Sequence, residues 1–206
     1  MVPPFAYADK PHRRKHGPKG YRDHRQYREW LRDEWTFRCA YCLRRELWLT
    51  RRRDWHVEHF AARALRADLA LDYENLVFAC AACNGAKATK KLPDPCNVAY
   101  GDLVEVAPDG QINAKNDEGR YLIEKMQLDD EECTRLRRVI LGIVELAREH
   151  ADSAQATVVI RELLGFPENL PDLANQPEPP GGNSRPEGLK DCFFALRARN
   201  ELPDYY

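Results

Sequence analysis

The chain has 206 residues, of which 43% are hydrophobic and 32% charged, and its formal net charge is −1. This composition is typical of a soluble globular protein with one core, or of a small domain with appendages. The sequence has no run of about 18 apolar residues and no apolar signal segment, which excludes a transmembrane helix and predicts a cytoplasmic protein.

The small net charge hides a separation of charge along the chain. Residues 10–53 hold 15 Lys and Arg against 5 Asp and Glu, whereas residues 54–206 hold 17 against 27. A basic N-terminal part of this kind can lie along the phosphates of a nucleic acid. The alternative is a solvated, partly disordered tail that binds no ligand.

The first half of the chain predicts one helix, two strands and a second, short helix. Residues 1–21 are rich in Pro, Gly and basic side chains, so we expect a flexible basic arm. Aromatic and leucine residues at roughly helical spacing predict a helix over 22–37. Strands are expected at 55–60 and 76–79, and a short helix is expected over 84–91.

The second half predicts a hairpin followed by helices. Residues 102–114 are expected to form a β-hairpin that turns at Pro108-Asp109-Gly110. The helix near 130–150 has Asp129 or Asp130 as its expected N-cap. Two further helices are expected near 118–127 and 152–164.

The C-terminal part has a different composition. Residues 167–188 hold six prolines and three glycines, which predicts a linker. Residues 189–198 then predict an amphipathic helix within a C-terminal tail, which docks on the body of the protein or on a partner.

The seven cysteines point to a metal site. An odd number of cysteines without a secretion signal argues against a disulfide framework. Four of them form two Cys-x-x-Cys pairs, and structural Zn²⁺ prefers four sulfur ligands in tetrahedral geometry. We therefore expect structural zinc, the alternative being free buried cysteines or a redox pair. The expected ligands are Cys39, Cys42, Cys80 and Cys83, whereas Cys96, Cys133 and Cys192 are expected to be ordinary buried thiols.

Polar residues with a characteristic order lie between and after the two cysteine pairs. Glu58 and His59 stand in the stretch WHVEHF, Asn75 stands in Tyr-Glu-Asn-Leu, and Asn84 and Lys87 follow the second pair. This order and spacing closely resembles the HNH endonuclease family, in its zinc-stapled branch of ββα-metal nucleases. The resemblance covers about residues 39–90.

The resemblance implies an α+β fold. Its core would be a ββα-metal (His-Me finger) HNH domain stapled by the four-cysteine zinc site, with a basic N-terminal helix and a mainly helical C-terminal extension. The expected parts are an arm at 1–21, the nuclease domain at 22–96, a hairpin plus helical extension at 97–166, a linker at 167–188 and a tail at 189–206.

The resemblance also implies roles for individual residues. His59 would be the general base, and Glu58 and Asn84 would be ligands of one Mg²⁺ or Mn²⁺ ion, which suits oxygen donors. Asn75 would orient the histidine loop through hydrogen bonds and hold the imidazole in its working tautomer. Taken singly, Glu58 and His59 could be a structural ion pair, Asn75 a turn residue and Asn84 only a helix N-cap.

Other positions have weaker assignments. His56 matches no family position, which favours packing or a place at the substrate edge. Lys87 would contact phosphate or pack the helix end. Many family members have proline where this chain has Ala62, and Glu58 replaces a commoner aspartate. The expected contacts with the DNA backbone are Arg51, Arg52, Arg53 and Lys87.

A narrower resemblance rests on the string VEHF, the Tyr-x-Asn-Leu segment and a Leu-Pro-Asp-Pro stretch followed by a hairpin. These features are similar to small HNH nucleases of anti-phage defence, such as the nuclease subunit of Septu-type systems and certain retron effectors. Such nucleases act beside an ATPase of the ABC/SMC type. The acidic helices and the tail would then face that partner, or else they only cover the nuclease core.

The leading hypothesis is therefore a Mg²⁺-dependent DNA endonuclease. A non-catalytic zinc-finger module that binds nucleic acid or protein is the rival from another class. An RNA-directed nuclease would use the same residues as a DNA-directed one.

Overall fold

The computed structural model describes residues 3–48 and 54–206, and the expected DNA contacts at Arg51–Arg53 lie outside the described residues. The chain divides into two compact units. The helical unit comprises Met1–His12, Leu92–Phe166 and Asp204–Tyr206, and the cysteine unit comprises Arg13–Lys91 and Pro167–Pro203. No helix among the described residues is both long and apolar enough to cross a membrane.

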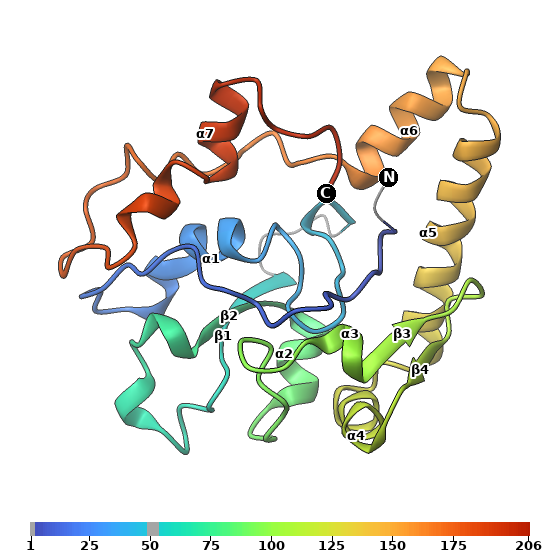
Figure 1. The fold of residues 1–206 in the computed structure, drawn as a ribbon. Helices are drawn as coiled ribbons and strands as arrows, with labels where there is room; N and C mark the ends of the chain where they lie inside the picture. Colours follow the sequence, from blue (N-terminus) through green and yellow to red (C-terminus); the bar gives the residue numbers. More distant parts are fainter. Residues whose placement is uncertain (1–2, 49–53) are drawn as a thin grey trace. The chain divides into compact units, whose positions relative to one another are not determined.

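Two strands and a helix form the centre of the cysteine unit. Strand β1 (Trp55–His59) pairs antiparallel with β2 (Leu76–Cys80), with Val57 opposite Phe78. Every residue of β2 is buried, as expected for a short apolar run covered on both faces. Helix α2 (Ala81–Lys87) follows β2 directly (Figure 1). The predicted α+β class and the strand, strand, helix order are confirmed.

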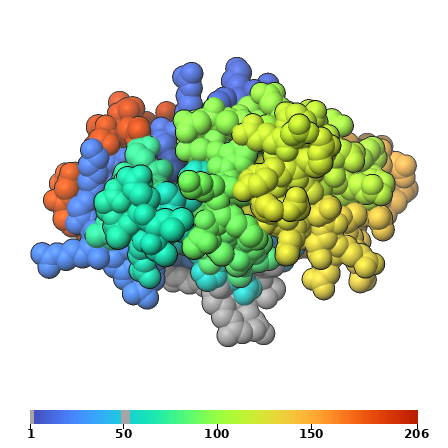
Figure 2. All heavy atoms as spheres, turned by 90° about the horizontal axis from the view of Figure 1, so that it is seen from below, coloured from blue at the N-terminus to red at the C-terminus, as the bar shows by residue number. Residues whose placement is uncertain are grey.

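A long excursion connects β1 to β2. It contains two short 3₁₀-helices, η4 (Ala67–Leu69) and η5 (Tyr73–Asn75). Residues 63–68 of the excursion are exposed, and Figure 2 shows this part of the chain in teal at the surface. The strands thus bring Glu58 and His59 to the point where the chain leaves the sheet.

The helix predicted over 22–37 is shorter and begins with a 3₁₀ turn. It consists of η1 (His24–Tyr27) and α1 (Arg28–Glu34). Asp23 caps η1, since its carboxylate accepts from the backbone N–H of Arg25 at 2.9 Å. The helix ends early because Thr36 and Phe37 take left-handed backbone conformations, with φ of 52° and 53°.

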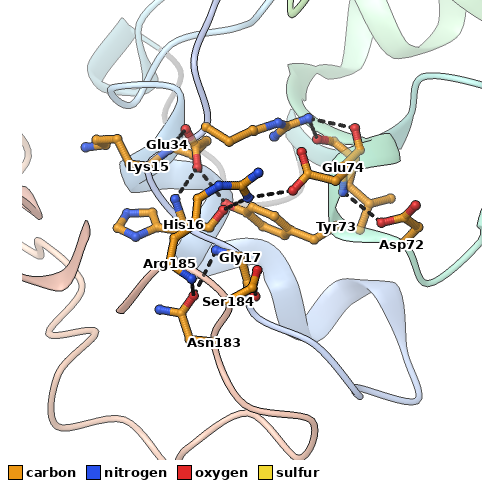
Figure 3. A network of polar contacts seen from close by, with 12 residues as sticks. Lys15, His16, Gly17, Glu34, Asp72, Tyr73, Glu74, Asn183, Ser184 and Arg185 are labelled. Carbon is orange, nitrogen blue, oxygen red and sulfur yellow. Dashed lines mark hydrogen bonds and ion pairs between the residues drawn. The ribbon is translucent and has the colours of Figure 1, made fainter. Parts of the chain in front are cut away.

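Residues 13–21 belong to the cysteine unit and are bonded to it, in contrast to the flexible arm that the composition predicted over 1–21. The backbone N–H groups of Lys15 and His16 donate to the Glu34 carboxylate at 2.9 and 3.0 Å (Figure 3). His16 is fully buried, and its Nε2 lies 2.8 Å from Oδ2 of Asp33. Two buried acids on one helix therefore hold this basic segment in place.

The Pro-rich segment predicted as a linker also belongs to the cysteine unit. Gly17 donates its backbone N–H to Oδ1 of Asn183 at 2.9 Å, and Arg185 forms a 2.6 Å ion pair with Glu74 (Figure 3). The backbone of Lys19 exchanges hydrogen bonds with residues 181 and 182. These bonds satisfy backbone groups that no helix or strand pairs. The segment continues into η6 (Pro186–Leu189) and α7 (Phe193–Ala198).

Asp33→Asn is expected to lower the free energy of unfolding at neutral pH by about 3–5 kcal/mol, because it removes one partner of a buried charged cluster. The Asp33 carboxylate accepts from His16 and Lys15, both at 2.8 Å, and from the backbone N–H of Phe193 at 2.7 Å. Urea unfolding at pH 7 measures the loss, and Asp152→Asn, at an exposed position, is the matched control.

The same variant has a defined pH dependence. Burial raises the pKa of Asp33, but the hydrogen bond from His16 and the charge of Lys15 outweigh it, so the pKa lies below the ordinary 3.8. A depressed carboxyl pKa stabilises the fold fully above the unfolded value, and this contribution is lost as pH falls through the folded pKa. The stability gap between wild type and Asp33→Asn should therefore narrow below about pH 4. A gap that widens on acidification would contradict this account.

The helical unit contains the predicted hairpin and helices. Short helix α3 (Tyr100–Leu103) was not expected, and it leads into β3 (Val104–Val106), which pairs with β4 (Ile112–Ala114). The hairpin turns at Gly110, where φ is 84°. Three helices follow, each capped by a polar side chain, and Asp130 is the cap of the second. They are α4 (Asp117–Met126), α5 (Glu131–Glu149) and α6 (Ala154–Leu164).

Candidate active site

The four expected zinc ligands come together in the cysteine unit. Their Sγ atoms all lie within 4.8 Å of one another, and all four residues are buried. Cys39 and Cys42 lie in a turn closed by the backbone bond from Leu43 N–H to the Cys39 carbonyl at 3.1 Å, while Cys80 ends β2 and Cys83 lies in the first turn of α2. Within residues 3–48 and 54–206, no other cluster of three or more His, Cys, Asp and Glu ligands occurs.

The spacing of the thiols fits zinc. Sulfurs bound at about 2.3 Å in a tetrahedron are about 3.8 Å apart, and the Sγ atoms of Cys42 and Cys80 are 3.7 Å apart. The two pairs therefore form the predicted four-cysteine centre. Of the other three thiols, Cys192 is buried as expected, whereas Cys96 and Cys133 are half-buried.

A second feature is a pocket of about 610 Å³ where β1 ends. Glu58 and His59 reach it from β1, and Asn84 reaches it from α2. The structure thus brings together three of the four residues expected to be catalytic. Asn84 lies inside α2, whose N-cap is Cys80, so the interpretation of Asn84 as a mere helix N-cap is wrong.

Glu58 is buried and paired. Its Oε1 lies 3.0 Å from Nζ of Lys87, and this ammonium group also donates to the carbonyl of His59 at 3.1 Å. Burial raises the pKa of Glu58, and the charge of Lys87 counteracts the rise. The ion pair engages one carboxylate oxygen and leaves Oε2 as a hard donor for a cation.

Lys87 is not placed where the expected contact with phosphate could form. Its side chain is fully buried, and its charge is neutralised by Glu58. A buried ammonium group must be paired inside the protein, so it is not a surface group that meets a DNA backbone. The other alternative, packing at the end of the helix, describes its position.

His59 has a defined tautomer. Its Nε2 lies 3.0 Å from the carbonyl oxygen of Ala70. A carbonyl only accepts hydrogen bonds, so Nε2 carries the proton and the neutral ring has its lone pair on Nδ1. Burial lowers the pKa of His59, the Ala70 carbonyl counteracts this, and the charges of Arg63 and Lys87 lower it further. The neutral, proton-accepting form is therefore favoured at neutral pH.

Asn75 ties together the ends of the excursion. Its Oδ1 accepts from the backbone N–H of Ala61 at 2.7 Å, and its Nδ2 donates to the carbonyls of Ala61 and Leu69 at 3.1 and 3.2 Å. The residue after Leu69 is Ala70, whose carbonyl orients His59. Asn75 thus holds the loop, as expected. The imidazole tautomer is set by the Ala70 carbonyl of that loop and not by Asn75 itself.

Three further polar residues line the same pocket, and only His56, expected in packing or at the substrate edge, had been considered from the sequence. His56 lies two residues before Glu58 on β1, so both side chains point to one face, and strand alternation alone could have placed it there. Arg63 is exposed on the excursion. His24 comes from η1, and its ring centroid lies 4.7 Å from that of His59. No motif in the sequence indicates that His24 approaches His59.

The chain was also compared with known proteins. A search of curated proteins finds no match to this chain. Residues 39–90, which contain the four-cysteine centre, His59 and its loop, match the HNH endonuclease family model, and this match supports a nuclease.

Proposed function

We propose that this chain is a metal-dependent endonuclease that hydrolyses phosphodiester bonds of DNA. His59 would be the general base, and Glu58 and Asn84 would hold one Mg²⁺ or Mn²⁺ ion. The observation that carries the proposal is the bond from His59 Nε2 to the Ala70 carbonyl, in the pocket that Glu58 and Asn84 also line. It leaves Nδ1 unprotonated, in a pocket that hard oxygen donors also line.

These groups match the needs of phosphodiester hydrolysis. A water must lose a proton as it attacks phosphorus, and Nδ1 of a neutral His59 accepts that proton. A divalent cation, when bound, supplies charge stabilisation at the phosphate. Asn75 keeps the excursion closed so that the Ala70 carbonyl stays in place. Arg63, exposed at the same pocket, would bind a non-bridging phosphate oxygen.

The rival binding module accounts for fewer of these features. A zinc module that only docks nucleic acid needs the four cysteines, but it needs neither a buried carboxylate nor an imidazole of fixed tautomer. Burying Glu58 costs free energy that its ion pair with Lys87 only partly offsets. Such a cost is typical of functional sites.

The nature of the substrate and of any partner rests on the resemblance. Basic residues of the N-terminal part would give affinity for a phosphate backbone without reading bases. An anti-phage role and an ABC/SMC-type ATPase partner stay predictions, as does the choice of DNA over RNA.

The test is digestion of a supercoiled plasmid with Mg²⁺, Mn²⁺ or EDTA. We expect cleavage with either cation and none with EDTA, and we expect Glu58→Gln to lower the rate at least about 100-fold because a neutral amide binds a hard cation weakly. Mn²⁺ titration calorimetry should show weaker binding in the same variant. Glu149→Gln, exposed at the end of α5, is the matched control.

Two results would contradict the proposal. One is cleavage that persists in EDTA, and the other is a folded, zinc-containing Glu58→Gln protein that cleaves like wild type. Running a single-stranded RNA and a single-stranded DNA of the same sequence in parallel decides between the two substrates.

A further inference from the structure

His24 is held beside His59 by contacts of its own short helix. The Asp23 cap fixes the start of η1, and Oδ1 of Asp23 lies 3.4 Å from Nδ1 of His24. Just after His24, the Tyr27 hydroxyl donates to the Leu71 carbonyl at 3.0 Å, which ties η1 to the excursion. The position of His24 is thus set by the fold.

The two imidazoles line one pocket, and their rings lie in contact with each other. Their ring centroids are 4.7 Å apart, with an angle of 50° between the ring planes, and both rings line the pocket that contains Glu58 and Asn84. Because Nδ1 of His24 lies toward Asp23, Nε2 is the nitrogen that can donate to a substrate. Phosphodiester hydrolysis needs one proton removed from water and one delivered to the leaving oxygen.

We propose that His24 is a second catalytic residue, which protonates the leaving oxygen of the cleaved phosphodiester while His59 accepts the proton of the attacking water. This inference rests on the proposed nuclease function. The water oxygen bonds to phosphorus, the bond from phosphorus to the leaving oxygen breaks, and the proton of His24 passes to that oxygen. Afterwards His59 returns its proton to solvent and His24 takes one up, so that the cycle closes.

In the free protein the surroundings of His24 favour its neutral form, so the acid role depends on charge that the substrate brings. Burial lowers the pKa of His24, the proximity of His59 and the charges of Arg63 and Arg25 lower it further, and Asp23 raises it. A phosphodiester in the pocket adds negative charge close to the ring, which favours the protonated imidazole. Binding of the substrate would therefore prepare the acid.

The test uses oligonucleotides in which sulfur replaces one bridging oxygen, either the 3′ or the 5′ oxygen of a single linkage. A thiolate leaves without being protonated, so an acid catalyst matters little at that linkage. We expect His24→Gln to lower cleavage of the ordinary linkage by about 100- to 10,000-fold. At one of the two sulfur linkages His24→Gln should lower the cleavage rate by less than about tenfold. His59→Ala should lose cleavage of both the ordinary and the sulfur linkages.

Two more variants separate chemistry from packing. His24→Phe keeps a ring against His59, and it should cleave the ordinary linkage as slowly as His24→Gln does. His150→Gln, exposed and outside the cysteine unit, should cleave like wild type. Zinc content and circular dichroism confirm that each variant is folded.

Each alternative result has its own meaning. If His24→Gln loses cleavage equally at ordinary and sulfur linkages, His24 only positions His59. If His24→Phe cleaves the ordinary linkage at the wild-type rate, the His24 ring contributes only packing. Either result overturns the acid role. A folded wild-type protein that cleaves no linkage would instead overturn the proposed nuclease function, and the inference with it.

Discussion

His59→Ala is expected to lower DNA cleavage by roughly 100- to 10,000-fold, the contribution typical of a positioned acid or base. The variant removes the Nδ1 lone pair that the Ala70 carbonyl leaves free. It should not disturb the fold, because His59 ends β1 and is only half-buried, and the backbone bond from Phe60 to Asn75 does not involve its side chain. Plasmid digestion at saturating Mg²⁺ measures the loss.

The control for this experiment is His150→Ala, which changes an exposed histidine of the helical unit. It should retain the wild-type rate. Zinc content should be unchanged in both variants, since neither residue belongs to the four-cysteine centre. A His59→Ala protein that cleaves at the wild-type rate would show that another group is the base.

The second large effect is expected from Cys80→Ser, which should lose zinc and unfold the cysteine unit. Apparent binding free energies of structural zinc in zinc-finger peptides are about 10–16 kcal/mol, as large as the whole stability of a typical domain, about 5–15 kcal/mol. Cys80 belongs both to β2 and to the centre, so its loss removes a ligand from the junction of sheet and helix. Zinc content and circular dichroism measure the effect.

Cys133→Ser is the matched control for this substitution. Cys133 is half-buried in α5 of the helical unit and lies outside the four-cysteine centre, so the variant should keep its zinc and its helix content. A soluble, zinc-free Cys80→Ser protein with wild-type circular dichroism would show that the thiols do not form a structural zinc centre.

Local sequence features predicted the elements well where a short-range rule governs them. A short apolar run predicts a strand that is buried on both faces. The strand predicted at 76–79 is confirmed as β2, in which every residue is buried. The Pro108-Asp109-Gly110 turn and the Asp130 cap depend on neighbours a few residues away, and both are confirmed. Cysteine spacing likewise predicted the metal centre, because each Cys-x-x-Cys turn supplies two ligands by itself.

Contacts between distant residues decided the rest. Composition predicted a flexible arm over residues 1–21 and a linker over 167–188. Buried acids on α1 and the side chains of Asn183 and Arg185 instead hold residues 13–21 and the Pro-rich segment within the cysteine unit. The pairing of Lys87 with Glu58 depends on how α2 crosses the end of β1, which no local pattern encodes.

The candidate active site shows the same division. The order of Glu58, His59, Asn75 and Asn84 along the sequence was enough to select them as a group. That the Ala70 carbonyl sets the tautomer of His59, and that His24 stands beside it, follows only from the folded excursion and from η1. The sequence by itself determines which functional groups the chain carries and how far apart they stand along it. Tertiary packing decides whether each group is protonated and on which atom, because a pKa and a tautomer depend on neighbours that the fold brings together.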